Sequence, residues 1–322
     1  MFGRLCSLAG ARQVLVAVLV VMALLAPAVV AAQFPADDPA TACSREHLKD
    51  SVKVGQFVFR SYKNTADGDA CLQVLHDGRI IFRRTLGNDG HYTLGQPADK
   101  KWKVPAIANG TDITGRGPPD MIVSFYTGGA HCCLLHYVFE LEPEFRLLAT
   151  LDARDSWPAY FADLDHDQHY YYLAEDWTFA YWWMSFAGSP YHSIVLHYAD
   201  DSKGGGFHLA MDKMQARAPT QVEWQTALGD MRGKLQLDKE KMFNDLPDVL
   251  WQEVLGLIYT GHSDLAWKFL DEVGPRAQQG NYPDLASFCS TLKTSPYWPD
   301  LAPTLKNTPP ACANATADRQ GK

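Results

Sequence analysis

Short apolar stretches alternate with turns between residues 52 and 211, whereas after Pro219 the apolar residues recur at spacings of three and four. The first pattern is typical of β-strands and the second of amphipathic helices. The sequence therefore predicts a mainly β domain over residues 33–215 and a small all-α domain over 216–305. A Pro-, Ala- and Thr-rich flexible tail over 306–322 is predicted to follow.

Eight strands are predicted in the β region, and a short one is expected after a glycine-rich loop at 203–206. The eight strands are Gln56–Tyr62, Cys71–Leu75, Arg79–Arg84, Met121–Tyr126, Leu134–Leu141, Arg146–Leu151, Tyr170–Ala174 and Ser193–Tyr198. His76-Asp-Gly78 between two of them is a hairpin signal. The predicted helices are Val222–Leu235, Lys239–Thr260, Ser263–Val273 and Tyr282–Leu292.

The N-terminus has the pattern of a secretory signal peptide. Arg4 and Arg12 precede an apolar run from Val14 to Leu25, and Pro27 leads into small residues ending at Ala32. The apolar run is shorter than the roughly twenty residues that span a bilayer. We therefore predict cleavage after residues 1–32, secretion or periplasmic localisation, and no membrane anchor afterwards.

Charge narrows the class of partner. Removal of residues 1–32 takes away two arginines and no acid, so 27 basic and 37 acidic side chains leave a net charge of −10. A chain this acidic lacks the basic surface that neutralises phosphates, which argues against nucleic acid and anionic membranes as partners. Metal cations, or a protein or glycan partner in the envelope or outside the cell, fit better.

Six cysteines remain in the mature chain, and an even number in an exported protein indicates disulfides. Six cysteines allow fifteen connectivities. The simplest of them joins neighbours along the chain. It pairs Cys43 with Cys71, Cys132 with Cys133, and Cys289 with Cys312.

Two segments carry oxygen-bearing residues at alternate positions and run directly into a predicted strand. They are Asp112-Ile-Thr-Gly-Arg-Gly-Pro-Pro-Asp120 and Asp163-Leu-Asp-His-Asp-Gln-His-Tyr-Tyr171. Carboxylate and carbonyl oxygens in such a tight loop can wrap a hard cation such as calcium. An acidic turn without a metal is the alternative for both segments.

This spacing resembles the FG-GAP or VCBS repeat of integrin-like β-propellers, in which each calcium-binding loop lies within one four-stranded blade. The resemblance implies an irregular, propeller-like domain of short antiparallel sheets, and a structural calcium as the possible cofactor. The implied metal ligands are Asp163, Asp165, Asp167 and the carbonyl of His169 in the second loop, and Asp112, Thr114 and Asp120 in the first.

Two positions depart from the family pattern. Tyr171 stands where the family has its last acid, and Arg116 stands at the fifth position of the first loop, where its guanidinium can replace a cation. The wider arrangement, with Gly-Gly-Ala-His-Cys-Cys after the first loop and an aromatic stretch after the second, also resembles an uncharacterised group of exported bacterial proteins. That likeness implies no activity.

Cys132 and Cys133 are adjacent and lie close to His131 and His136. A structural role is favoured, either as a vicinal bridge or through bonds to other cysteines. Reduced thiols with these histidines would instead offer soft ligands to zinc or copper, or a redox site.

A dense aromatic segment follows the second loop. Flat rings on a rigid scaffold suit stacking on sugars or gripping a peptide, and core packing is the competing interpretation. The candidate ligand-binding residues are Trp177, Tyr181, Trp182 and Trp183.

No nucleophile, phosphate-binding or dinucleotide motif is present. The sequence is therefore interpreted as an exported, non-enzymatic binding or scaffold protein of the cell envelope. One alternative is a polysaccharide-active hydrolase or lyase, and another is a soft-metal or redox protein centred on Cys132 and Cys133.

Overall fold

The computed structural model describes residues 43–63, 69–87, 89–129, 133–183, 185–200, 205–241, 246–273 and 285–317, without the side chains of 235–241 and 246–248. The predicted signal peptide, residues 1–32, lies outside these ranges. Residues Asp38–Lys322 form one compact unit. No helix in the described ranges combines the length and the apolar character needed to span a bilayer.

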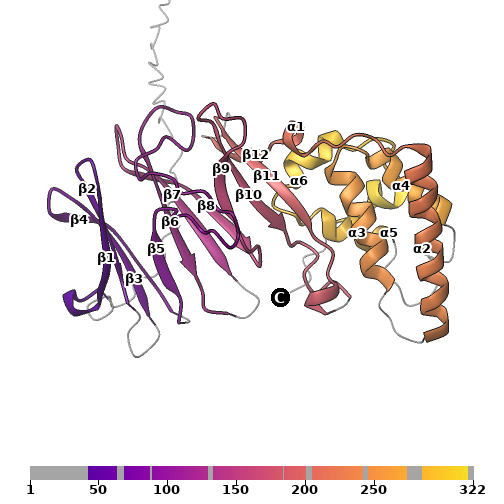
Figure 1. Ribbon diagram of the computed structural model, residues 1–322, viewed down its shortest axis with the longest axis horizontal. Helices are drawn as coiled ribbons and strands as arrows, with labels where there is room; N and C mark the ends of the chain where they lie inside the picture. Colours follow the sequence, from indigo (N-terminus) through magenta and orange to yellow (C-terminus); the bar gives the residue numbers. More distant parts are fainter. Residues whose placement is uncertain are drawn as a thin grey trace, which may run out of the picture. The chain divides into compact units, whose positions relative to one another are not determined.

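Three four-stranded antiparallel sheets come first and helices follow, which confirms a mainly β region ahead of a helical one (Figure 1). Within the described ranges the sheets do not close into a ring, so the propeller-like arrangement stays a prediction. Each sheet is a meander of four consecutive strands. Sheet 1 contains β1 (Leu48–Val54), β2 (Phe57–Tyr62), β3 (Ala70–His76) and β4 (Arg79–Leu86).

Sheets 2 and 3 repeat this topology. Sheet 2 contains β5 (His91–Leu94), β6 (Asp120–Tyr126), β7 (Leu134–Glu140) and β8 (Arg146–Arg154). Sheet 3 contains β9 (Tyr160–Asp163), β10 (Tyr170–Asp176), β11 (His192–Ala199) and β12 (Gly206–Leu209). The predicted hairpin after His76 is confirmed, because Asp77 and Gly78 take φ values of 50° and 76°, as a tight two-residue hairpin turn requires.

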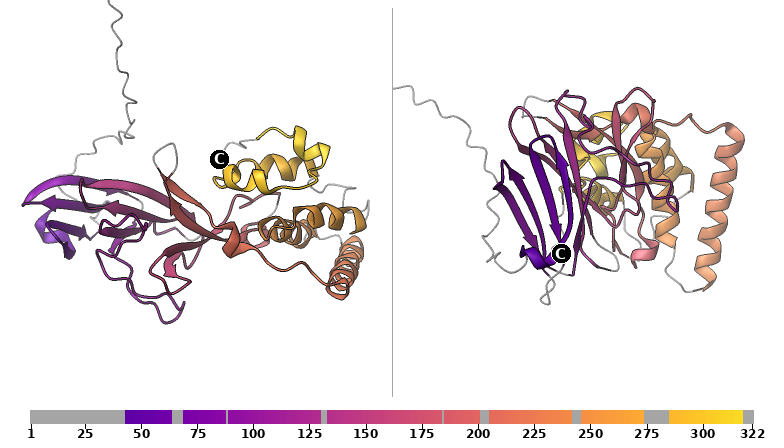
Figure 2. Two further views of the ribbon diagram at one scale, coloured as in Figure 1. Left: turned by 90° about the horizontal axis from the view of Figure 1, so that it is seen from above. Right: turned by 60° about the vertical axis from the view of Figure 1, so that its left-hand side comes forward.

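The helices follow sheet 3 in the chain (Figure 2). They are α1 (Met211–Met214), α2 (Gln221–Lys241), α3 (Leu246–Tyr259), α4 (Ser263–Val273), α5 (Leu285–Leu292), α6 (Trp298–Leu301) and α7 (Pro310–Asn314). The described residues also form three short 3₁₀ turns, which are η1 (Arg45–His47), η2 (Phe186–Gly188) and η4 (Ala302–Thr304). Thr220 and Glu223 start α2 with a reciprocal capping box, since each side chain accepts a hydrogen bond from the other's backbone N–H.

Sheet 2 is buried on both faces. Alternation along β6 sends Val123 into a cluster with Phe59 of sheet 1, and Ile122 into a cluster with Phe161 of sheet 3. The second cluster continues from sheet 3 into the helices, where Val254 and Ile258 of α3 are fully buried. The β-rich and helical regions therefore share one hydrophobic core.

Two of the predicted disulfides are present. Cys43–Cys71 joins the start of the described chain to β3, and Cys289–Cys312 joins α5 to α7. Cys133 is also disulfide-bonded, while Cys132 lies outside the described residues. Helix α7 and buried Cys312 lie within the region predicted as a flexible tail, so residues 310–314 are helical rather than extended.

A buried carboxylate ties sheet 3 to the helices. Asp176 ends β10, and its side chain accepts hydrogen bonds from Tyr259 Oη at 2.5 Å and Ser295 Oγ at 2.6 Å. Its other oxygen accepts from the backbone N–H and the hydroxyl of Thr178. The Asp176 carboxylate thus accepts four hydrogen bonds, from Tyr259, Ser295 and the N–H and hydroxyl of Thr178.

Candidate functional site

The two aspartate loops occupy the same place in sheets 2 and 3, between the first and second strands of each meander. In the first loop Asp112 accepts from the N–H groups four and five residues on, at 3.1 and 2.7 Å. In the second loop Asp163 makes the same two contacts, at 3.1 and 3.0 Å. The residues three and five positions after each of these aspartates all take positive φ. The loops are therefore two copies of one conformation.

Basic side chains bind the acids around both loops. Arg116 donates from Nε to the buried carboxylate of Glu140 at 2.9 Å and also pairs with Asp200. Lys213, from α1, binds both oxygens of Asp165 at 2.8 and 2.7 Å. The Lys213 ammonium therefore stands beside Asp165, where a metal cation would have to bind.

Other side chains of the second loop are also engaged. Tyr171 donates its hydroxyl to Asp165, and Asp167 accepts from the backbone and lies against the ring of His169. Among the described residues no group of three or more His, Cys, Asp or Glu side chains is arranged to hold a metal ion. As arranged, these side chains do not present a set of free oxygens to calcium, and a calcium site here stays a prediction.

Asp120 ends the first loop and is 1% exposed. Its Oδ2 accepts from Ile113 N, Thr114 N and Thr114 Oγ1, whereas its Oδ1 is buried without a hydrogen-bond partner in the described structure. Burial raises the pKa of this carboxyl to about 6. The protonated form of Asp120 is therefore favoured more strongly in the folded state than in the unfolded chain.

This pKa predicts how stability depends on pH. The pKa in the folded state lies above the ordinary value of 3.8. Asp120 therefore contributes its full stabilisation below pH 4 and loses it as pH rises through 6. Asparagine does not ionise, so Asp120→Asn should remove this loss. Its free energy of unfolding relative to that of wild type should rise by about 2 kcal/mol between pH 4 and pH 7. Urea titrations at several pH values measure it, with exposed Asp230→Asn as control. An unchanged difference across this pH range would contradict the assignment.

The aromatic segment divides between core and surface. Trp177 and Trp182 are 8% and 4% exposed, and Trp182 packs edge-on against Trp251 in α3. Tyr181 and Trp183 are 57% and 61% exposed. Of the four predicted ligand-binding residues, only these two present their rings to solvent.

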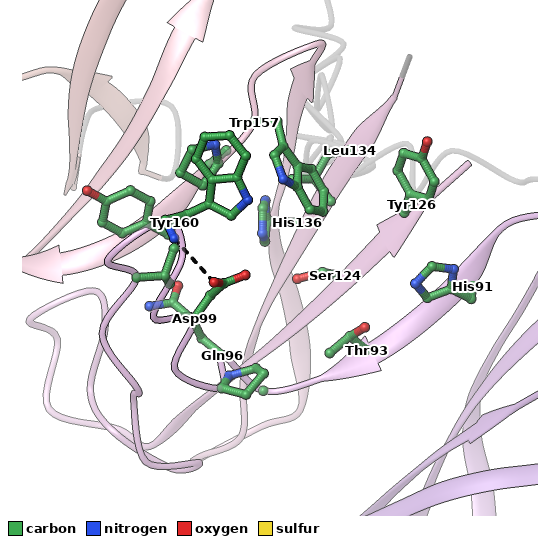
Figure 3. A pocket seen from close by; sticks show the side chains of 16 residues that line it. His91, Thr93, Gln96, Asp99, Ser124, Tyr126, Leu134, His136, Trp157 and Tyr160 are labelled. Atoms are coloured by element: carbon green, nitrogen blue, oxygen red, sulfur yellow. Dashed lines mark hydrogen bonds between the residues drawn. The ribbon is translucent and has the colours of Figure 1, made fainter. Parts of the chain in front are cut away.

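A cleft of about 170 Å³ lies between sheets 2 and 3 (Figure 3). One wall comes from β5, β6 and β7, and the other from the β8–β9 connection and the long β5–β6 connection. Four aromatic side chains line it: Trp102, Tyr126, Trp157 and Tyr160. Trp157 is 53% exposed and its ring meets that of Tyr126 edge-on at 5.9 Å. The cleft thus combines a narrow volume with accessible flat rings.

A row of polar groups crosses the sheet at the base of this cleft. Thr93, Ser124 and His136 are directly opposite one another on β5, β6 and β7, so their side chains share a face. No hydrogen bond to another described residue engages the hydroxyls of Thr93 or Ser124. Figure 3 shows both side chains among the cleft residues. These hydroxyls are therefore available to a ligand.

His136 is neutral in this setting. It is 4% exposed, and burial lowers its pKa to about 4. Nδ1 is hydrogen-bonded to Tyr172 Oη at 2.8 Å, which fixes the ring orientation. The imidazole can offer one further hydrogen bond, through Nε2, without bringing a charge into the cleft.

Gln96 fixes the second wall. Its side chain donates to the carbonyls of Pro105 and Phe161 and accepts from Phe161 N at 2.7 Å, so it takes the place of a strand partner for β9. The segment it anchors carries Trp102, and the carboxylate of Asp99 accepts from the N–H groups of Lys101 and Trp102. The wall is therefore held by hydrogen bonds within its own turn and by those that tie Gln96 to Phe161.

Sequence reasoning missed this cleft. Its residues come from four separated segments between positions 91 and 160, and no motif links them. The one available signal was Trp157 beside Pro158 in a connection between strands, because a large aromatic residue in a loop is a common mark of a binding surface. No protein-family model matches the chain, and neither the curated proteins nor the solved structures include a significant match.

Proposed function

We propose that this is an exported, non-enzymatic binding protein whose cleft takes one ring of an uncharged sugar. The observation that carries the proposal is the placement of the half-exposed Trp157 ring in the same narrow cleft as the Thr93, Ser124 and His136 row. Sugars present C–H faces that stack on flat aromatic rings and hydroxyls that need polar partners. The cleft offers both kinds of contact.

The charge of the cleft favours a neutral ligand. Its lining contains no lysine or arginine among the described residues. Burial and nearby Lys49 lower the pKa of His91, and the deeper His136 is uncharged near neutral pH. The described lining itself therefore offers no fixed cation to an anionic sugar or phosphate, and Lys49, which is not part of that lining, donates to the carbonyl of Tyr92 at 3.4 Å.

Binding is favoured over hydrolysis of a polysaccharide. Glycosidases normally place two carboxyl groups on either side of the scissile bond. Among the described residues that line the cleft, Asp99 is the one acid, and its carboxylate accepts from two backbone N–H groups of its own turn. The cleft therefore offers sugar contacts without a pair of catalytic carboxylates.

The repeated meander supports a relationship to FG-GAP-like blades. Each sheet has four consecutive strands, and sheets 2 and 3 carry the same aspartate loop at the same connection. We propose that the three sheets are an open set of such blades, in which the side chains of Arg116 and Lys213 take the place of calcium at the two loops. Ligand binding by the cleft does not depend on this relationship.

Trp157→Ala tests the proposal. Loss of one stacked ring should weaken binding about tenfold, since aromatic contacts contribute roughly 0.5–1.5 kcal/mol beyond the buried area. The measurement is calorimetric titration with glucose, galactose, mannose and N-acetylglucosamine. Ser124→Ala should also weaken binding, and exposed Val222→Ala is the control on a helix away from the cleft. Unchanged affinity in both cleft variants, binding of peptides alone, or release of reducing ends from polysaccharides would contradict the proposal.

A further inference from the structure

Two connections meet at one end of sheets 2 and 3. One joins β8 to β9 and contains Trp157, and the other joins β10 to β11 and contains the aromatic segment (Figure 1). Ser156 Oγ accepts from Glu175 N at 2.8 Å and donates to its carbonyl at 3.2 Å. Arg154 donates to the carbonyl of Trp177 at 3.0 Å. These contacts hold the aromatic segment beside the mouth of the cleft.

The aromatic segment alternates between anchored and exposed rings. Phe179 and Trp182 are buried in the core and pack against Phe288 of α5. Tyr181 and Trp183 flank Trp182 and are both more than half exposed. The buried Trp182 ring therefore fixes the segment, while Tyr181 and Trp183 keep more than half of their surface exposed. The Trp183 indole N–H donates to Ser287 Oγ of α5 at 3.3 Å.

Both exposed residues have an unfavourable backbone conformation. Tyr181 has φ of 60° and Trp183 has φ of 62°, in the left-handed region that large side chains rarely adopt. The surrounding structure imposes it, because Ser189 Oγ accepts from Tyr181 N at 2.8 Å and Trp182 is held in the core. Glycine would relieve this strain at either position. Strain retained at exposed aromatic residues is characteristic of functional sites.

Further rings support this surface from behind. Trp177 lies stacked between Phe186 at 4.7 Å and Tyr191 at 4.4 Å, and the ring of Tyr181 lies 5.6 Å from that of Phe186. Tyr191 is itself 37% exposed. Its backbone N–H and carbonyl are both hydrogen-bonded to the side chain of Gln252 in α3. The exposed rings are thus carried on a rigid base.

We infer that an aromatic rim, made of Trp157, Tyr181, Trp183 and Tyr191, extends the cleft into a surface for a chain of several neutral sugar rings. The inference rests on the proposed function, because Trp157 belongs to both the cleft and the rim. The ligand class it names is a neutral polysaccharide bound along its length. Successive sugar rings would stack on separate aromatic faces at little entropic cost, since the protein rings are already fixed.

The test compares ligand length with removal of the rim. Wild-type protein is titrated with cello-, malto-, manno- and chito-oligosaccharides of one to six rings. We expect affinity to rise by at least tenfold from the monosaccharide to the hexasaccharide in one of these series. The double variant Tyr181→Gly with Trp183→Gly should lower hexasaccharide affinity by about tenfold, which is roughly threefold for each of the two lost aromatic contacts. Its melting temperature should change little, because the relief of positive φ at both glycines offsets the loss of the Trp183–Ser287 hydrogen bond.

The outcomes separate the two proposals. If monosaccharides bind but affinity does not increase with length, or the glycine variant keeps full hexasaccharide affinity, the rim has no such role and the cleft proposal stands. If no sugar of any length binds, both proposals are wrong. Concentration-dependent self-association abolished by the glycine variant would show that the rim contacts a second copy of the chain. A large fall in melting temperature would show a structural role for these rings.

Discussion

Asp176→Ala is expected to lower the free energy of unfolding by about 4 kcal/mol. The substitution removes the acceptor shared by Tyr259, Ser295 and Thr178, and leaves the hydroxyls of Tyr259 and Ser295 buried without it. A buried donor without a partner costs roughly 1–3 kcal/mol, and two are left at once. Guanidinium denaturation followed by tryptophan fluorescence measures the loss.

Two variants control this result. Asp230→Ala changes an exposed carboxylate on α2 and should alter stability by less than about 0.5 kcal/mol. Asp176→Asn keeps one acceptor oxygen, so its loss should fall between those of the alanine variant and wild type. If Asp176→Ala were as stable as Asp230→Ala, the carboxylate would not join sheet 3 to the helices.

The second large effect is expected from the disulfide between α5 and α7. Replacing Cys289 and Cys312 together by alanine should cost about 3 kcal/mol, because the bond closes a loop between residues 23 apart in sequence. Both positions are buried, so neither alanine side chain would be exposed to solvent. Urea denaturation under non-reducing conditions measures the change.

Limited proteolysis locates the consequence. In the Cys289→Ala, Cys312→Ala variant, cleavage should appear first between residues 302 and 317. Only side-chain packing and the hydrogen bonds from Lys293 to the carbonyls of Ala313 and Ala315 then hold α7 near α5. The matched variant Cys43→Ala, Cys71→Ala should lose similar stability, since its loop joins residues 28 apart, but should keep the C-terminal segment protected. Identical cleavage patterns in the two variants would contradict this assignment.

The strands that sequence analysis missed share a physical property. All eight strands predicted with bounds are present within a few residues, but β1, β5 and β9 were not predicted. Each is the first strand of its meander and lies at a sheet edge. β5 and β9 have four residues each, and β1 is mostly exposed, so none carries a full alternation of apolar and polar positions. Pairing with the neighbouring strand, rather than local pattern, makes them strands.

The helical region shows where local pattern is sufficient. Ser263–Val273 was predicted with the observed bounds, because its apolar stripe and the preceding Gly261, at φ of 87°, mark the helix and the turn before it. The tail was predicted less well. α7 starts at Pro310 and has only five residues, and its packing depends on a disulfide to a residue 23 positions earlier.

The candidate site was predicted only in part. Exposure of Tyr181 and Trp183 and burial of Trp177 and Trp182 cannot be read from a run of aromatic residues, because the division depends on which rings reach α3 and α5. The row of Thr93, Ser124 and His136 exists only through strand register. Neither local composition nor motif spacing contains that information.

The meander topology also sets an order in which the chain can assemble. Every strand in the three sheets pairs with its neighbours in sequence, so each sheet can form from local pairings, of which β5 with β6 closes the longest connection. The hydrogen bonds that Asp176 accepts from Tyr259 and Ser295 span 83 and 119 residues, so they need α3 and the segment after α5. A chain that emerges N-terminus first can therefore complete its sheets one after another, whereas the helix-facing side of sheet 3 is the last large apolar surface to be covered. During synthesis and folding, that surface is where misassembly and chaperone binding would concentrate.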